Sequence, residues 1–482
     1  MVGLVLLAAV LRAIGLNGGL WLDEILTLVE SVRRPLAQIV TVFPGNNQHT
    51  LSSVLAHISI GLFGEAPWSL RLPALLFGVA AVPALYLFAR EFVGRAEALL
   101  AGLLLAVSYH HVWFSQNARG YSALAFFTLI SSWLLLRGLR RGTRSDFLWY
   151  GVTSALGAYT HLTMVFVVLA QAMACAILLG LPRFDKETWQ RWRLPATGFV
   201  LAALFTLVLY APLLLDVQQF FLKRPPPPDV ATPKWAARAM LSGLQVGTGT
   251  ALGALAGAAL FVCGLWSYLR QSRFLLALFV LPGVIIVATV LALRQPIFPR
   301  FLFFLAGFGV LIVVRGALEI GDWLTRRLKR DAAPAPMTAL GFALVALMVV
   351  ASAASLAFDY RYPKQDFESA MQLVQARRVE GEPVLTAGGA VYPYREYYRL
   401  PWVGLTSLEQ LRQIRAQGRR VWVVYSLPEY MEARTPGLTQ IIRNECAVAG
   451  VFRGTVAGGD VTVCTLPAAG TVDRIPEKGG LS

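Results

Sequence analysis

The feature that most constrains this chain is a succession of apolar runs, each long enough, or nearly so, to cross a lipid bilayer. A spanning helix needs roughly 17 to 25 such residues. With 56% hydrophobic and only 15% charged residues in 482, the apolar surface exceeds what a soluble core could hide. The sequence therefore predicts a polytopic α-helical membrane protein with about eleven transmembrane helices. The runs begin near Leu4, Leu72, Ala98, Tyr121, Phe147, Thr163, Leu194, Thr250, Phe274, Phe301 and Met337.

Charge between the runs predicts which connections face the cytoplasm. Basic residues gather in alternate connections, as in cytoplasmic loops, so the net charge of +16 does not indicate a nucleic-acid partner. The basic connections are 90–97, 137–147, 182–193, 270–273 and 315–331. The connections expected to face outside are 17–71, 115–120, the turn around His161, 216–249, 294–300 and everything after Phe358.

One short run decides this orientation. The run from Leu51 to Leu62 contains three serines and a histidine, a composition typical of an amphipathic helix lying at the membrane interface. If it lies there, Asp23 shares the outer compartment with the C-terminal tail. If it spans, Asp23 faces the cytoplasm.

Two domains are expected. A membrane domain over 1–357 has outer loops 17–71 and 216–249, and Pro225 to Pro228 make the second loop either a mobile gate or an extended spacer. Near residue 358 the composition becomes that of a soluble protein, and alternating helical and strand patterns predict an extracytoplasmic α/β domain over 358–482. Its expected helices are Phe367–Arg378, Leu408–Gln417 and Gly437–Asn444, and its expected strands are Pro383–Ala387, Arg420–Tyr425, Ala447–Phe452 and Val461–Leu466.

The acidic pair Asp23 and Glu24 follows the first apolar run. Carboxylates are scarce in this chain, and like charges near a low-dielectric boundary raise each other's proton affinity, so one of them could serve as a general base. The alternative is that the pair only caps a helix entering at Ile25, because acidic side chains accept backbone N–H bonds at helix starts. The pair alone leaves both interpretations open.

Basic groups recur on the same predicted side. Arg119, beside Tyr121, and Arg300, approached through two prolines, are suited to binding a phosphate, since a guanidinium donates two parallel bonds to oxyanions. Each could instead be a snorkelling anchor of a helix end. His49 and His161 end apolar runs on this side and are candidate site residues or hydrogen-bonded interface residues. No three-ligand metal set is predicted, and a divalent cation at the acid pair stays open.

Several short motifs in order resemble a known family. They are Trp21-Leu22-Asp23-Glu24, His49 before a helix ending Leu62-Phe63-Gly64, Ser69-Leu70-Arg71-Leu72-Pro73, Asn117-Ala118-Arg119-Gly120-Tyr121, Tyr159-Thr160-His161 and Pro299-Arg300-Phe301. Together they resemble the bacterial protein mannosyltransferase and aminoarabinose transferase type of membrane glycosyltransferase, with the GT-C fold (glycosyltransferase family 39 and relatives). The resemblance covers the membrane part, most densely residues 13 to 162. Where this chain has His49-Thr50-Leu51, the family often has His-Pro-Pro-Leu. Where this chain has Pro299-Arg300-Phe301, the family often has Pro-Arg-Tyr, so the hydroxyl expected at position 301 is missing.

The resemblance implies inverting transfer of a sugar from a polyprenyl-phosphate donor to a cell-envelope acceptor, a lipid, glycan or protein. It places the site and the tail on the outer face of a bacterial cytoplasmic membrane. Asp23 would be the catalytic base, with Glu24 beside it. The residue types fit, because Arg119 and Arg300 would stabilise the departing polyprenyl phosphate.

Two other functions are open. A transporter or flippase of a lipid-linked sugar would use a similar groove, but coupled transporters usually carry ionisable residues at bilayer mid-depth, where these spans lack acids. An enzyme with a dead site, whose outer domain acts as a receptor, is the third possibility.

Four cysteines are present. Cys175 and Cys263 lie in apolar runs and are expected to be packing residues. Cys446 and Cys464 flank the last predicted strand pair, and an oxidising compartment would favour a bridge. A tight turn at Gly458 would separate them beyond bonding reach, whereas a turn centred on Thr455 would align them, so bridged and unpaired thiols are both open.

Overall fold

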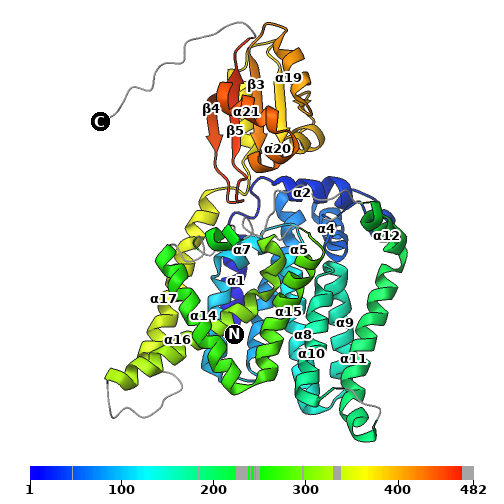
Figure 1. Cartoon of the computed structure of the whole chain (residues 1–482), viewed down its shortest axis with the longest axis vertical. Coiled ribbons are helices and arrows are strands. Elements are labelled where there is room, and N and C mark those ends of the chain that lie inside the picture. The colour runs from blue at the N-terminus through cyan, green and yellow to red at the C-terminus, as the bar shows by residue number, and fades with distance from the viewer. Residues whose placement is uncertain are drawn as a thin grey trace. The chain divides into compact units, whose positions relative to one another are not determined.

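The computed structural model describes residues 1–45, 47–181, 185–223, 237–238, 240–243, 245, 250–295, 298–328 and 338–468 (Figure 1). Contacts divide the chain into two compact units. Among the described residues, the first unit consists of Met1–Gly18 and those from Glu30 to Arg361, and the second of Gly19–Val29 and those from Tyr362 to Ala468. The segment with the acid pair thus groups with the C-terminal residues, although the sequence assigned all of 17–71 to a loop of the membrane domain. Pro225 to Pro228 lie outside the described residues.

The first unit is helical, and a helix occupies each of the apolar runs identified in the sequence. These helices are α1 (Val2–Ala13), α5 (Pro67–Ala89), α6 (Arg95–Ala106), α8 (Tyr121–Arg141), α9 (Arg144–Thr160), α10 (Met164–Leu179), α11 (Lys186–Tyr210), α14 (Ala251–Gln271), α15 (Arg273–Ala292), α16 (Ala306–Leu328) and α17 (Ala339–Arg361). Shorter elements are α3 (Leu36–Thr41), α4 (Thr50–Phe63), α7 (Tyr109–Ser115), α12 (Leu214–Lys223) and the 3₁₀ helix η3 (Pro299–Leu305).

Length and hydropathy qualify seven helices among the described residues as membrane spans, or eight if α6 and α7, bent by 59°, form one broken span. The predicted class, a polytopic helical protein with a small C-terminal sheet, is confirmed. The run from Leu51 to Leu62 is helical as α4, and its interfacial position stays a prediction.

Close helix pairs hold the first unit together. Within it α8 packs between α5 and α9, and α9 packs on α11 (Figure 1). Helices α14 and α16 approach most closely at two glycines: a Cβ on Gly264 would lie 1.9 Å from the Ile312 carbonyl, and one on Gly316 would lie 1.9 Å from that of Leu260. Small residues allow such approach in membranes, where packing rather than hydrophobicity drives helix association.

A buried arginine stabilises the break between α6 and α7. Arg12 of α1 is fully buried and donates to the Ala106 carbonyl at 3.0 Å, to Ser115 Oγ at 3.2 Å and to His111 Nδ1 at 2.8 Å. The last carbonyls of a helix have no internal partner and carry its negative dipole end, so a cation there compensates for the break. Gln116 in turn donates to the Ile14 carbonyl at 2.6 Å. These bonds fix the start of the segment that carries Arg119.

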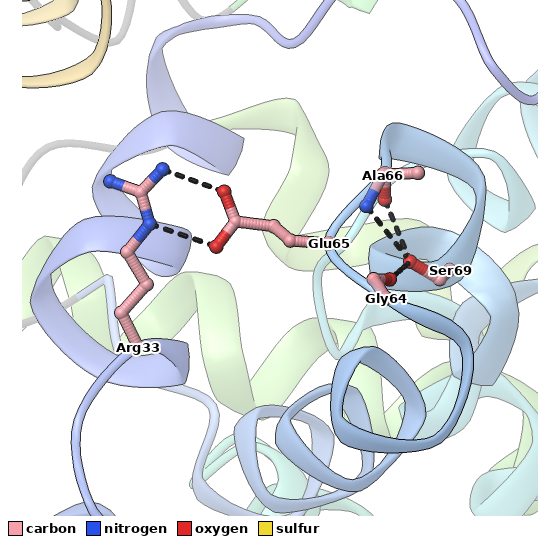
Figure 2. Close-up of polar contacts among 5 residues, drawn as sticks. All are labelled: Arg33, Gly64, Glu65, Ala66 and Ser69. Atoms are coloured by element: carbon pink, nitrogen blue, oxygen red, sulfur yellow. Dashed lines mark hydrogen bonds and ion pairs between the residues drawn. The ribbon is translucent and has the colours of Figure 1, made fainter.

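The segment that leads into α5 is also anchored within the first unit. Arg33 and Glu65 form a bidentate ion pair, with N···O distances of 3.0 and 2.7 Å (Figure 2). Ser69 Oγ accepts the Ala66 N–H at 3.1 Å and lies 2.6 Å from the Gly64 carbonyl, capping α5 (Figure 2). Buried Arg71 donates to the carbonyls of residues 16 and 18, both at 2.8 Å. The Ser69-to-Pro73 motif is thus an anchor for this segment.

The second unit contains a five-stranded sheet of order β2-β1-β3-β5-β4. Strands β1 (Val384–Gly388), β2 (Val403–Gly404) and β3 (Val421–Ser426) are parallel, and β5 (Val461–Leu466) is antiparallel to both β3 and β4 (Ala447–Phe452). The helices are α2 (Leu22–Thr27), α18 (Phe367–Arg377), α19 (Leu408–Arg415), α20 (Pro428–Arg434) and α21 (Pro436–Glu445), with the π-helix η4 (Pro393–Tyr397). Every element expected between Phe367 and Leu466 is confirmed, while β2, η4 and α20 were not predicted.

Cys446 and Cys464 form a disulfide, with Cα atoms 5.6 Å apart. Both expected turn geometries are wrong. Cys464 pairs with Val448, a bulge interrupts the ladder between Val448 and Gly450, and β4 ends at Phe452 opposite Val461. Cys446, which ends α21 just before β4, therefore reaches Cys464 diagonally across the pair.

Candidate active site

His49 forms the centre of a buried polar cluster in the first unit. It lies in the connection between α3 and α4, and only 3% of it is exposed. Its Nδ1 accepts the backbone N–H of Gly120 at 2.6 Å, and Arg119 Nη2 lies 3.3 Å from its Nε2. A Cβ on Gly120 would lie 2.6 Å from the same Nδ1. Only glycine therefore allows the segment before α8 to approach the imidazole this closely.

His161, directly after α9, completes the cluster. Its Nδ1 accepts the Thr163 N–H at 3.2 Å and lies 2.8 Å from the Thr163 hydroxyl, which can donate to it. Its ring packs edge-on against His49, with centroids 4.7 Å apart. The Tyr121 ring lies 5.1 Å from that of His49 and 5.7 Å from that of His161. Three connections distant in sequence thus converge on one point.

The two predicted phosphate-binding arginines both act on these histidines. Arg119 lies 5.7 Å from the centre of the Tyr121 ring, and Arg300, at the start of η3, lies 4.6 Å from that of Phe298. Burial, followed by the charges of Arg119 and Arg300, lowers the pKa of His161 to about 3. Burial and the same two arginines, with His161, lower the pKa of His49 well below its usual value.

The cluster is therefore a source of positive charge and N–H donors. Both histidines are neutral at physiological pH, and because His161 Nδ1 accepts a backbone N–H, its ring proton lies on Nε2. An arrangement of two guanidinium groups and the Nε2–H donor of His161 is suited to binding an oxyanion such as a phosphate. The structure brings Arg119, Tyr121, His49 and His161 together, and Arg300 acts on the two histidines through its charge; their roles in binding stay predictions.

Asp23 and Glu24 lie on α2 in the second unit. Glu24 is fully buried, and its Oε2 accepts the Trp21 N–H at 3.4 Å, which is the capping interaction that the sequence left open for the pair. Asp23, one position earlier, is half-buried, and its backbone carbonyl accepts the Thr27 hydroxyl at 2.8 Å. The pair is thus divided, with Glu24 holding the helix start and Asp23 as the candidate base.

Among the residues that the structure describes, no group of three or more His, Cys, Asp or Glu side chains is placed to hold a metal ion. A divalent cation at the acid pair stays a prediction.

Sequence reasoning missed three contributors. Gly120 stood inside a recognised motif, but its role depends on a close approach by His49. Arg12 lies inside the first apolar run, where nothing in the sequence indicates its contact with the Ala106 carbonyl. Gln365, whose Oε1 accepts the Leu22 N–H at 3.0 Å, carried no signal, because its partner is 343 residues away.

Comparison with known proteins identifies the fold. The family model of dolichyl-phosphate-mannose-protein mannosyltransferases matches residues 50–215. The fold is similar to ArnT from Cupriavidus metallidurans in the apo state, with a TM-score of 0.56, 14% identity, and coverage of 96% of this chain and 97% of that chain. The chain has the GT-C fold. For this GT-C protein the resemblance expected from its motifs is confirmed.

Two further solved structures agree, one of them again of ArnT. ArnT bound to undecaprenyl phosphate gives a TM-score of 0.54 at 13% identity, covering 97% of this chain and 98% of that chain. The Archaeoglobus fulgidus oligosaccharyltransferase in complex with zinc and sulfate gives a TM-score of 0.50 at 12% identity, covering 95% of this chain and 72% of that chain. The family model is named for mannosyltransferases and the Archaeoglobus fulgidus neighbour is an oligosaccharyltransferase, in agreement with the expected enzyme class.

One curated relative matches in sequence. The inferred mannosyltransferase YkcB of Bacillus subtilis (strain 168) is 29% identical over 112 residues. This match covers 23% of the GT-C chain and 16% of YkcB, so the chain aligns with only a small part of that relative's length.

Proposed function

We propose that this protein transfers a sugar from a polyprenyl-phosphate donor to a cell-envelope acceptor, with inversion at the anomeric carbon. The observation that carries the proposal is the convergence of His49, Arg119, His161 and Arg300 in a unit built of apolar helices. A lipid-linked phosphate needs both an apolar environment for its chain and buried cations for its head group. The structural neighbour ArnT was solved with undecaprenyl phosphate bound.

The chemistry needs one base and one stabilised leaving group. In a single displacement, an acceptor hydroxyl or amine attacks the anomeric carbon while its proton passes to the Asp23 carboxylate. The anomeric C–O bond breaks, and its electron pair goes to the phosphate oxygen. Arg119 and Arg300 stabilise the charge of the departing polyprenyl phosphate, so no separate general acid is required. Glu24 keeps α2 in place.

The proposal assigns the site and the C-terminal residues to the outer face of a bacterial cytoplasmic membrane. Two observations support this assignment: the basic connections predicted to lie inside, and the Cys446–Cys464 disulfide, which is typical of an oxidising compartment. A cysteine introduced at Thr406 should react with an impermeant thiol reagent in intact spheroplasts, and one at Thr143 should not. Labelling at Thr143 alone would contradict the orientation.

Transfer itself is tested with radiolabelled donor. The relatives named as mannosyltransferases make mannosyl-phosphoundecaprenol the first probe, with the aminoarabinose-linked carrier as the second. Purified protein in liposomes with envelope extract should move label from the carrier to an acceptor and release undecaprenyl phosphate. Movement of intact donor between leaflets, without cleavage, would identify a flippase. Neither cleavage nor movement with either probe would contradict the proposal.

A further inference from the structure

Helix α2, which carries Asp23, has only six residues. Helices of this length are not stable alone, because the first four backbone N–H groups have no partner within the helix and nucleation is unfavourable. Their direction is set by the groups that bind those N–H groups. Glu24 accepts one from Trp21, and the next along the chain, from Leu22, is accepted at 3.0 Å by Gln365.

Gln365 is itself fixed by contacts with other residues of the second unit. Its side chain is 2% exposed, and its Nε2 donates to the Gly459 carbonyl at 3.3 Å. The preceding backbone pairs with the β4–β5 connection, whose Thr455 and Val456 N–H groups donate to the carbonyls of residues 363 and 364 at 2.9 and 3.2 Å. The amide oxygen that meets Leu22 is thus fixed by the C-terminal residues of the chain.

A second surface of the same unit supports α2. Helix α2 packs on η4, where Tyr394 is fully buried. The Tyr394 hydroxyl donates to the Phe367 carbonyl at 2.9 Å, and its ring lies 4.7 Å from that of Trp402. The short helix therefore has a rigid support as well as a capped start.

We infer that Gln365 is a positioning residue for the reaction: by binding the Leu22 N–H it sets the orientation of Asp23, which follows Leu22 directly. This inference rests on the proposed function, in which Asp23 is the base. It gives the C-terminal residues a role in positioning the proposed base. Small displacements of a base from its substrate reduce turnover without reducing donor affinity.

The test compares three variants in liposomes with radiolabelled mannosyl-phosphoundecaprenol or whichever probe proves active. Gln365→Met keeps the side-chain length and removes both bonds. We expect kcat to fall about tenfold, the effect of one lost hydrogen bond to a buried group, with the donor KM nearly unchanged. The matched control is Gln410→Met, because Gln410 in the same unit accepts the Thr406 N–H at 3.0 Å but on helix α19. Its kcat should equal that of the wild type.

Gln365→Glu separates positioning from a merely structural role. A carboxylate can still accept the Leu22 N–H, so kcat should recover in part. The donor KM should stay near the wild-type value, as in Gln365→Met. Formation of the Cys446–Cys464 bridge, read by mass spectrometry, reports that the unit has folded in each variant.

The outcomes are distinguishable. Wild-type turnover in Gln365→Met, with Asp23→Asn inactive, would refute the inference and leave the proposed function intact. Full activity in Asp23→Asn would refute the proposed base and the inference with it. Equal losses of kcat in Gln365→Met and Gln410→Met, without partial recovery in Gln365→Glu, would reduce Gln365 to a structural residue.

Discussion

Replacement of Gly120 by alanine should damage the phosphate cluster specifically. A Cβ at this position would lie 2.6 Å from His49 Nδ1, 2.7 Å from Thr160 Cγ2 and 3.0 Å from Ser52 Oγ. Ordinary contacts begin near 3.4 Å, so the imidazole must move by roughly 0.8 Å or the start of α8 must shift. Overpacking of a well-packed site typically costs about 1–3 kcal/mol.

This cost should affect binding and turnover at the site, because the atom that must move, His49 Nδ1, is the acceptor of the Gly120 N–H. A cost of about 2 kcal/mol corresponds to a roughly 30-fold loss in affinity or rate. We therefore expect Gly120→Ala to bind undecaprenyl phosphate more weakly and to lose turnover, with a lowered Tm. Binding is measured by thermophoresis in detergent, turnover by label release, and Tm by intrinsic fluorescence.

The matched control is Gly309→Ala in α16, where an added Cβ would meet nothing within 4 Å. It should be neutral or slightly stabilising, since alanine is favoured over glycine inside helices. Wild-type affinity, turnover and Tm in Gly120→Ala would show that the His49 contact is not as close as described and would refute the reasoning.

Three further predictions concern charge, pH and the disulfide. Arg119→Lys should weaken binding of undecaprenyl phosphate about tenfold, because lysine cannot form two parallel bonds to it; unchanged affinity would indicate a snorkelling anchor. Burial, with Arg119 and Arg300, lowers the pKa of His161 to about 3, below the roughly 6.5 of an unfolded histidine. The unfolded chain therefore binds more protons than the folded chain below pH 6.5. As the pH falls from 6.5 to 3, the free energy of unfolding decreases by up to about 1.4 kcal/mol per pH unit. A Tm of His161→Gln that falls with acid as steeply as that of the wild type would contradict this. The peptides that contain Cys446 and Cys464 should appear as one linked species when a non-reducing tryptic digest is analysed by mass spectrometry. Alkylation of both cysteines without prior reduction would exclude the bridge.

Local patterns predicted the elements well, because each is determined by its own residues. Apolar runs gave the helices of the first unit, and alternation gave strands such as Val461–Leu466. The elements that were missed are short and lack such a pattern. Strand β2 has two residues, and η4 is a π-turn whose buried Tyr394 is set by packing.

Long-range contacts were not predictable from these patterns. Nothing near Asp23 indicates that its helix is bound by Gln365, and nothing near Arg12 indicates a broken helix at Ala106. The strand pair of the disulfide was predicted, but its register was not, because the bulge before Gly450 depends on the pairing itself. The motifs gave His49, Arg119 and His161 as candidates, while their convergence follows from the packing of α4, α8 and α9.

The central claim, sugar transfer with Asp23 as base, is tested most directly by the initial rate of Asp23→Asn beside Glu24→Gln with radiolabelled polyprenyl-phosphate donor. The asparagine keeps the shape of the side chain and removes its ability to accept the proton, whereas Glu24 serves the helix start by accepting the Trp21 N–H. We predict that Asp23→Asn abolishes transfer while still binding undecaprenyl phosphate, and that Glu24→Gln, whose amide oxygen can still accept that bond, loses less activity. Wild-type transfer by Asp23→Asn would contradict the account.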